Sequence, residues 1–366
     1  MTVRIKTSVL LLALAICLIA GGFAIINRPT ETPKAKEIHK IGVLMNGSFE
    51  DRSYTQAQYD GLTGAVRDTG IRLVAQDNVP VDDAFPGRVK NLIASGCEII
   101  VCDNYMYDPY LIDLAAENPG VSFINASGTV TADNLSCCLG RLYQVRYLSG
   151  IVAGLQTKTN EIGYVLAYLT PETIRQMNAF TLGVRKVNPD AVVYMRHTDD
   201  WNDADKAAAV TAALLDAHSI DVLTQHVNPV TPLQVAQERG VWTIGNNFDN
   251  RELFADSYLT ACVFDWEPFF RARLNDCERN RFIGKNYWGS LRTGMVALSP
   301  LTAHCDERAQ QAVDEELSRL LDGSFDVFYG PIVDSHGTER VRAGENLSDE
   351  QLLYHMDWFV DGVVAE

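Results

Sequence analysis

The sequence predicts an α/β protein built from two Rossmann-like, doubly wound lobes with a ligand cleft between them. Three observations lead to this fold class. The length of 366 residues suits about two domains. Apolar runs of strand length alternate with segments of helical periodicity, as in βαβ units. The same alternation restarts after a break near residue 133, which predicts a second parallel sheet covered by helices.

The first series of elements begins at a short apolar run, Ile41–Met45. Ser53 stands where it would cap the helix that follows. Pro119 ends the last helix of the series, because proline cannot continue a helix. The further expected strands are Ile71–Ala75, Glu98–Cys102 and Val121–Asn125, and the expected helices are Ser53–Asp68, Pro86–Ser95 and Leu111–Glu117.

The second series follows a stretch, Asp133–Leu139, that is expected to be irregular. Its first helix, Arg141–Thr157, carries Gly150, Ala153 and Gly154, small residues that permit close packing. The expected strands are Ile162–Leu166, Ala191–Met195, Val222–Gln225 and Val241–Ile244, and the other helices are Pro171–Val187, Asp203–His218 and Pro232–Arg239.

The amino terminus predicts a membrane segment. Arg4 and Lys6 precede the apolar run Val9–Ile26, which is long for a cleaved signal and near the lower limit for a span. Basic residues before the run place the remainder outside the cytoplasm. Ile16 precedes Cys17, where a lipidation site has a small residue, so Cys17 is interpreted as an apolar member of the span. A cell-membrane protein with an extracytoplasmic body is expected.

The expected domain boundaries are as follows. Residues 1–26 form a signal anchor or signal peptide, 27–39 a linker, 40–127 lobe 1 with about 248–295 returning to it, and 128–247 lobe 2 with about 296–366 returning to it.

Composition and motifs disfavour several functions. The net charge of -16, with no basic stripe, argues against nucleic-acid binding. The sequence has no nucleophile elbow, P-loop or zinc-protease motif, so neither an enzyme nor a cofactor is expected. Asp199, Asp200 and Asp203 are interpreted as capping the next helix rather than holding a metal ion. His226 is interpreted as a hydrogen-bonded cleft residue rather than a general base.

The cysteines do not define a site. No CxxC pair occurs, and no cysteine and histidine residues have zinc-ligand spacing. Cys97 and Cys102 lie on or beside an apolar strand and are expected to be buried thiols. A disulfide between Cys277 and Cys305 stays open, because the sequence does not fix pairing.

Candidate ligand-binding residues lie in the loops after the strands, since ligands of such sheets bind outside the carboxyl ends of the strands. Two aromatic rings and several amides would suit a flat heterocycle that forms hydrogen bonds. An aromatic residue at a helix start also serves as a packing residue, so both interpretations stay open. The candidate residues are Tyr54, Trp201, Asn202, Asn228, Asn247 and Asp249.

From about residue 40 onward the chain resembles the basic membrane protein family of solute-binding proteins, which serve ABC transporters and bind purine nucleosides or related bases. The order and spacing of several motifs carry the resemblance. They are Gly140-Arg141-Leu142-Tyr143, Tyr147-Leu148-Ser149-Gly150, Thr157-Lys158-Thr159-Asn160, Ile162-Gly163-Tyr164-Val165, Asn178-Ala179-Phe180-Thr181-Leu182-Gly183-Val184, Val187-Asn188-Pro189-Asp190, Trp201-Asn202-Asp203 and Val241-Trp242-Thr243-Ile244-Gly245. The resemblance implies the type I periplasmic-binding-protein architecture.

The resemblance also implies roles for individual residues. Tyr54 matches the aromatic residue of the first lobe that stacks on the ligand, and Trp201 matches its counterpart in the second lobe. Asn247 and Asp249 fall in the loop that supplies acidic groups to the ribose in nucleoside-binding members.

The chain departs from the nucleoside-binding pattern at four positions. Met45, Ser127 and Asn247 stand where those members have aspartate, and Phe264 stands at the place of a lysine. The aromatic clamp is therefore kept while most of the ribose-binding groups are lost, which favours a free base over an intact nucleoside.

The expected function is capture of a purine-like base or nucleoside for an ABC transporter, by closure of two lobes around a ligand stacked between aromatic rings. The expected partners are that small molecule, a transporter permease, and the membrane through the N-terminal segment. The alternative is a ligand-sensing lobe that signals to a membrane partner.

Overall fold

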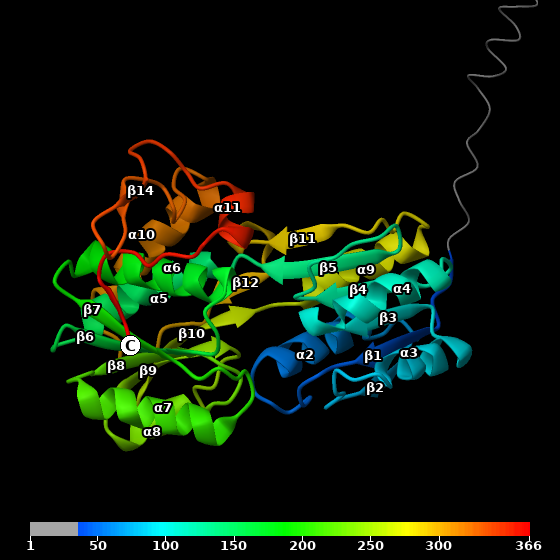
Figure 1. Ribbon diagram of the computed structural model, residues 1–366, viewed down its shortest axis with the longest axis horizontal. Coiled ribbons are helices and arrows are strands. Elements are labelled where there is room, and N and C mark those ends of the chain that lie inside the picture. The colour runs from blue at the N-terminus through cyan, green and yellow to red at the C-terminus, as the bar shows by residue number, and fades with distance from the viewer. Residues whose placement is uncertain (1–35) are drawn as a thin grey trace, which may run out of the picture.

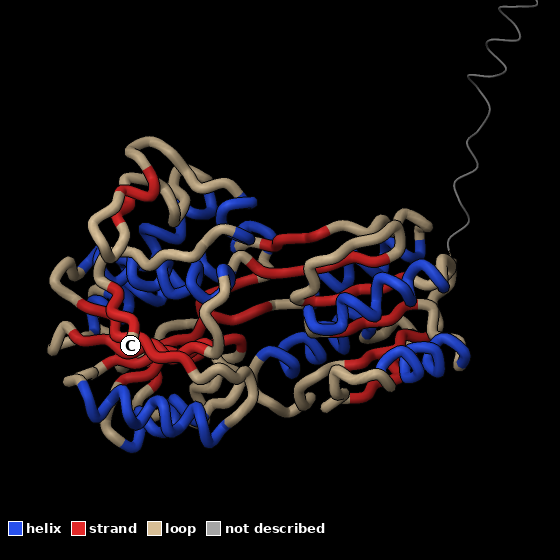
Figure 2. Tube along the Cα trace, in the orientation of Figure 1, coloured by secondary structure: helices blue, strands red, loops and turns tan. Residues whose placement is uncertain are grey.

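The computed structural model describes residues 36–366, which form two α/β lobes side by side (Figures 1 and 2). The first lobe holds a six-stranded sheet of order β11-β5-β4-β3-β1-β2, in which every pairing is parallel. Its strands are β1 (Lys40–Leu44), β2 (Arg72–Gln76), β3 (Ile99–Cys102), β4 (Ser122–Ala126), β5 (Leu135–Gly140) and β11 (Asn286–Gly289). Its helices are α2 (Tyr54–Val66), α3 (Phe85–Ala94), η1 (Tyr105–Tyr107), α4 (Asp108–Glu117) and α9 (Glu267–Glu278).

The second lobe holds a seven-stranded sheet of order β12-β10-β9-β8-β6-β7-β15, parallel except where β12 joins β10. Its strands are β6 (Glu161–Leu166), β7 (Val192–His197), β8 (Val222–His226), β9 (Trp242–Asn247), β10 (Tyr258–Phe264), β12 (Val296–Leu298) and β15 (Val363–Ala365). Its helices are α5 (Leu142–Gln156), α6 (Pro171–Val187), α7 (Ala204–Ala217), α8 (Thr231–Glu238), η2 (Leu291–Thr293), α10 (Ala309–Asp322) and α11 (Asp349–Tyr354), and a small hairpin joins β13 (Ile332–Val333) to β14 (Glu339–Val341).

Within residues 36–366, the chain crosses between the lobes three times. The first crossing lies between β5 and α5, the second between β10 and α9, and the third between β11 and β12. The expected first boundary at 127 and 128 lies too early, because β5 pairs with β4 in the first sheet. The segment that returns to the first lobe likewise starts after β10 rather than near 248, because β10 pairs with β9 of the second sheet.

The expectation that Asp133–Leu139 is irregular is wrong. Leu135 to Cys138 are all buried, and this segment extends the sheet between β4 and β11. Short polar and sulfur-bearing residues obscure the strand in the sequence, although a strand covered on both faces accommodates them.

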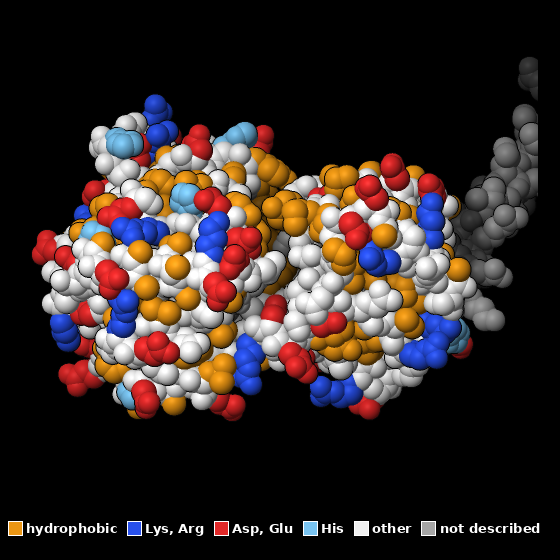
Figure 3. All heavy atoms as spheres, turned by 60° about the horizontal axis from the view of Figure 1, so that its bottom comes forward, with side chains coloured by type: hydrophobic (Ala, Val, Ile, Leu, Met, Phe, Trp, Pro, Cys, Tyr) orange, Lys and Arg blue, Asp and Glu red, His pale blue; other side chains and the backbone are white. Residues whose placement is uncertain are grey.

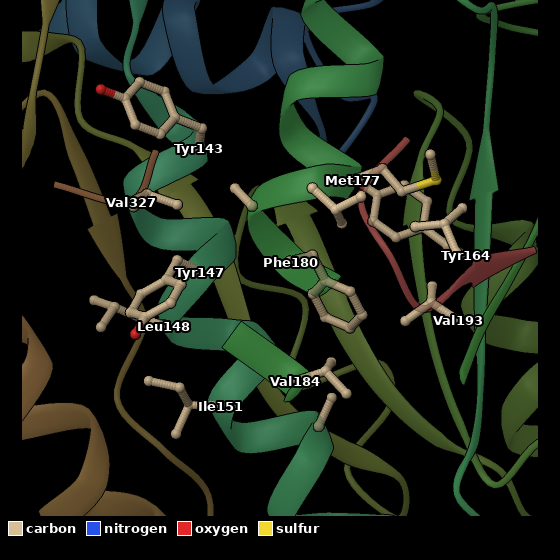
Figure 4. Close-up of a cluster of buried hydrophobic side chains, with 14 of the residues drawn as sticks. Tyr143, Tyr147, Leu148, Ile151, Tyr164, Met177, Phe180, Val184, Val193 and Val327 are labelled. Carbon is tan, nitrogen blue, oxygen red and sulfur yellow. The ribbon is translucent and has the colours of Figure 1, made fainter. Parts of the chain in front are cut away.

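The core of the second lobe lies around α5 and α6. Gly150 and Gly183 let the two helices approach closely, because a Cβ on Gly150 would lie 2.0 Å from the carbonyl oxygen of Phe180 and one on Gly183 would lie 1.9 Å from that of Tyr147. The prediction of close packing in this helix is confirmed. Figure 4 shows Tyr147 and Phe180 within this cluster of buried side chains.

The C-terminal segment is fixed to the second lobe. Strand β15 pairs with β7 and forms the edge of the sheet, and Glu366 forms an ion pair of 2.7 Å with Arg196. Asn178 of α6 donates a hydrogen bond from Nδ2 to the carbonyl oxygen of Trp358 at 2.8 Å. In Figure 1, this segment (red) brings α11 to the edge of the second lobe nearest to β11.

The cysteines between residues 36 and 366 are free thiols, including Cys277 and Cys305. Cys97 and Cys102 are buried, as expected. The predicted membrane segment Val9–Ile26, with Cys17, lies outside the described residues. None of the helices described from residue 36 onward has the length and apolar character required to cross a membrane.

Candidate functional site

A cavity of about 320 Å³ lies between the two lobes, and the space-filling view shows a furrow at their boundary (Figure 3). Residues just after β1, β3, β4, β6, β7 and β8 line it, together with Asn247 at the end of β9. The carboxyl ends of both sheets therefore face this space, as expected for ligand sites in doubly wound sheets.

Five of the six candidate residues line this cavity, and one does not. The five are Tyr54, Trp201, Asn202, Asn228 and Asn247. Asp249 lies outside the lining and forms an ion pair of 2.6 Å with Arg251. The guanidinium of Arg251 thus binds the carboxylate that, by the family resemblance, was expected to bind the ligand.

Tyr54 is the aromatic residue of the first lobe, at the first position of α2. Its ring lies edge-on to Phe264 and Trp266, at centroid distances of 5.7 and 5.8 Å. Its hydroxyl shares a hydrogen bond of 2.5 Å with Oγ of Ser127. Burial raises the pKa of Tyr54 well above its ordinary value, so the phenol stays neutral.

The cap of α2 differs from the expectation. The side chain of Ser53 makes no capping hydrogen bond. Asp51 takes this role instead, because its carboxylate accepts hydrogen bonds from the backbone N–H groups of Ser53, Thr55 and Gln56 at 2.7, 3.0 and 3.0 Å. An ionised acceptor binds helix N–H groups more strongly than a hydroxyl does.

Trp201 is the aromatic residue of the second lobe. It precedes α7 by three residues, in the loop after β7, rather than opening the helix. Its ring lies 5.7 Å from that of His226 and 6.0 Å from that of Tyr168. Asp203 caps α7 by accepting from the N–H of Lys206 at 2.9 Å, which confirms the capping interpretation for this carboxylate.

His226 lies in the cavity wall and is almost fully buried. Burial lowers the pKa of His226 to about 4, which leaves the ring neutral near pH 7. Its Nε2 lies 3.7 Å from Oε1 of Glu172, and its Nδ1 has no hydrogen-bond partner among residues 36–366. The expected position in the cleft is correct, whereas the expected hydrogen bond is not found in the described chain.

Two carboxylates of the cavity wall escaped the sequence analysis. Asp103 directly follows β3, and Glu172 lies in the first turn of α6. Burial raises the pKa of Asp103 to about 6. Its oxygens accept from the N–H of Asn46 at 2.8 Å and from Oγ1 of Thr55 at 3.0 Å. The sequence feature that could have identified Asp103 as a site residue is its position at the carboxyl end of a strand.

The positions at which the chain departs from the nucleoside-binding pattern mostly reach the cavity. Ser127, Asn247 and Phe264 line it, whereas Met45 is buried in the core of the first lobe. Asn247 also donates from Nδ2 to Oγ of Ser53, which joins the two lobes. This part of the wall therefore offers neutral groups where a ribose-binding site would carry charge.

The arrangement suits binding of a small polar molecule. Asparagine amides and a neutral imidazole supply donors and acceptors, and the rings of Tyr54 and Trp201 supply apolar faces. Within residues 36–366, no three acidic, histidine or cysteine side chains gather to hold a metal ion.

Two parallel-sheet lobes with a polar and aromatic cavity between the carboxyl ends of their strands define a two-lobed solute-binding protein. The chain belongs to the family of PnrA-like ABC transporter substrate-binding proteins (Bmp), whose model matches residues 38–324. The family and the fold are those of solute-binding proteins rather than of enzymes.

Three similar proteins illustrate the relationship. A purine-binding protein of Brucella abortus is 30% identical over 331 residues, 90% of this chain and 94% of the relative. A protein of Haloferax volcanii named as an ABC transporter glucose-binding protein is 30% identical over 280 residues, 76% of this chain and 68% of the relative. A solved ABC transporter solute-binding protein from Conexibacter woesei has a TM-score of 0.66 at 20% identity, covering 79% of this chain and 98% of its own. That likeness confirms the predicted fold.

Proposed function

We propose that the protein captures a purine base outside the cytoplasm and delivers it to the permease of an ABC transporter. The observation that carries this proposal is the pairing of Tyr54 and Trp201 from opposite lobes in one cavity, with asparagine amides beside them. A flat ligand placed between two aromatic residues gains apolar contact on both faces. The amides then read the hydrogen-bonding edge of the ring system.

A free base suits the cavity better than a nucleoside. Ser127, Asn247 and Phe264 offer a ribose no ionised group, and Asp249 is engaged by Arg251. Asp103 and Glu172 do carry carboxylates in the wall, but both oxygens of Asp103 already accept hydrogen bonds from Asn46 and Thr55, and Glu172 accepts one from Gln176. The purine-binding relative in Brucella abortus supports the same ligand class.

Calorimetric titration with adenine, guanine, adenosine and guanosine tests this proposal. We expect at least one base to bind more tightly than its nucleoside. Glucose is the matched negative ligand, because the relative in Haloferax volcanii is named for glucose. Consistently tighter binding of the nucleosides would overturn the preference for a base, and binding of glucose alone would overturn the purine class.

The location outside the cytoplasm rests on the apolar run Val9–Ile26 and the basic residues before it. We expect this segment to hold the protein at the membrane with the two lobes exposed. Protease added to intact spheroplasts should digest the lobes, with an unfolded sample as a control for cleavability. Protection until the membrane is lysed would contradict the proposed orientation.

A further inference from the structure

Helix α11 reaches the cavity from a part of the chain beyond the matched family region. That match ends at residue 324, and α11 begins at Asp349. Leu353 and Tyr354 at its C-terminal end nevertheless belong to the cavity lining. The segment after the matched region therefore contributes to the wall of the candidate site.

Two arginines hold α11 in place. Arg141 contacts both carboxylate oxygens of Asp349, at 2.9 and 2.5 Å, and its guanidinium packs 3.9 Å above the ring of Trp288. Arg175 of α6 donates from Nη1 to the carbonyl oxygen of Leu352 at 2.5 Å. Because the side chain of Leu352 is buried in the core of the second lobe, α11 is a fixed part of the wall.

A series of contacts connects Trp201, the aromatic residue of the second lobe, to α11 at the other end of the cavity. Trp201 contacts His226, and His226 approaches Glu172 at the start of α6. Arg175 follows about one helical turn along α6 and reaches α11. The cavity thus runs from Trp201 along the start of α6 to α11.

The end of the cavity at α11 is lined mainly by apolar side chains, beside the buried guanidinium of Arg175. Leu353 and Tyr354 share the lining with Leu139, at the end of β5, and Leu142, at the start of α5. Leu139 pairs in register with Trp288, the ring on which Arg141 packs, so these residues belong to the same region. The volume of about 320 Å³ falls in the range of pockets for drug-sized ligands, which leaves room beyond a bicyclic base.

We infer that α11, with Leu139 and Leu142, forms a second subsite that takes an apolar substituent carried by the ligand's ring system. This inference rests on the proposed purine-binding function. The substituent would remove apolar surface from water against Leu353 and Tyr354, and that burial would add affinity roughly in proportion to the area covered. Helix α11 would then select among bases by the group that they carry.

Titration of the full protein with adenine, N6-butyladenine and 9-butyladenine tests this subsite. We expect one butyl derivative to bind about tenfold more tightly than adenine, as burial of several methylene groups predicts. In Leu353→Asn, the ratio of the two affinities should fall to about threefold or less. Tyr354→Ala should lower the same ratio, and this variant should fold because Tyr354 is 52% exposed.

Leu321→Asn is the matched control, because it makes an equivalent change at an exposed leucine of α10 outside the cavity lining. It should keep the ratio of the wild-type protein. Binding of adenine without any gain from either butyl group would overturn the subsite and leave the purine function standing. A gain that neither Leu353→Asn nor Tyr354→Ala reduces would also overturn it. Absence of binding by all three compounds would instead remove the purine function on which the inference rests.

Discussion

Asn247 in the second lobe donates a hydrogen bond from Nδ2 to Oγ of Ser53 in the first lobe, over 3.2 Å. Both side chains are buried, and the neighbouring Asn250 donates to the backbone carbonyl of Arg52 at 2.9 Å. The loop after β9 is thus joined to the start of α2, next to the clamp residue Tyr54.

Removal of the acceptor should therefore destabilise the protein. Ser53→Ala leaves Nδ2 of Asn247 buried without a partner, which costs about 1–3 kcal/mol. Urea denaturation followed by circular dichroism measures this loss. Ser335→Ala, at an exposed serine, should change the free energy of unfolding by less than about 0.5 kcal/mol. Equal stability of the Ser53→Ala and wild-type proteins would show that the bond contributes nothing.

Loss of the Trp201 ring should weaken binding of the purine. Each stacked face contributes about 1–3 kcal/mol, so Trp201→Ala should bind about tenfold to hundredfold more weakly. Tyr54→Phe should lose far less affinity than Tyr54→Ala, because the hydroxyl of Tyr54 is bonded to Ser127 rather than free for the ligand. Calorimetry with the best-bound base measures these affinities. If folded Trp201→Ala stays within about twofold of wild type, the two-ring clamp is refuted and Trp201 serves packing alone.

The stability of the protein should depend on pH through two opposing groups. Asp103 has its pKa raised from 3.8 to about 6, so the native state binds the extra proton and the stability that it confers is lost as pH rises through this interval. His226 has its pKa lowered from 6.5 to about 4, so its contribution is present above pH 6.5 and is lost as pH falls through this interval.

Between about pH 4 and 6, Asp103 lowers the free energy of unfolding as pH rises, whereas His226 raises it. We expect Asp103→Asn to become more stable, relative to wild type, as pH rises across this range. His226→Gln should show the reverse trend. Each slope is at most about 1.4 kcal/mol per pH unit. Urea denaturation at several pH values measures both, and parallel curves for the variants and the wild type would contradict the pKa shifts.

Gly150→Ala should destabilise the protein, because α5 and α6 are in close contact at this position. The added Cβ would lie 2.0 Å from a backbone oxygen, which cannot move without shifting α6. Overpacking of this kind costs about 1–3 kcal/mol or more. Gly87→Ala in α3 is the matched control, because no atom lies within 4 Å of its added methyl group, and it should stabilise by about 0.5–1 kcal/mol. Similar Tm values for the two variants would refute the close approach.

Retention at the membrane should not require Cys17. Because Ile16 is a poor residue before a lipidation site, Cys17→Ser should stay in the membrane fraction with the wild-type protein. Cell fractionation and labelling with a fatty acid measure this. Release of the variant into the soluble fraction, or a label that depends on Cys17, would identify a lipoprotein instead.

Much of the fold could be predicted because buried parallel strands are short apolar runs. β3 and β8 differ from their expected ranges by only one residue at a terminus. β5 could not be predicted in this way, because its sequence is not a continuous apolar run. Its burial depends on its position in the sheet between β4 and β11. The cap of α2 also depends on local competition, because Asp51 accepts the N–H groups that Ser53 was expected to take.

The residues that line the cavity could be predicted in part, because ligand sites in doubly wound sheets lie at the carboxyl ends of the strands. Loops at the carboxyl ends of strands were correctly singled out, and five candidate residues line the space. Asp103 and Glu172 escaped because carboxylates follow many elements, and only tertiary packing decides which of them are buried. Leu353 and Tyr354 carried no local signal, since α11 is a six-residue helix far along the chain from the other lining residues.

The three crossings between the lobes restrict how the cavity opens. Three short connections, after Gly140, Phe264 and Gly289, join the same two lobes. A single connection would permit rotation about any axis, whereas three side by side constrain independent swivelling and leave bending as the main degree of freedom. Tyr54 and Trp201 belong to different lobes, so a single bending motion would set the gap between their rings. That gap would in turn set the thickness of ligand that fits.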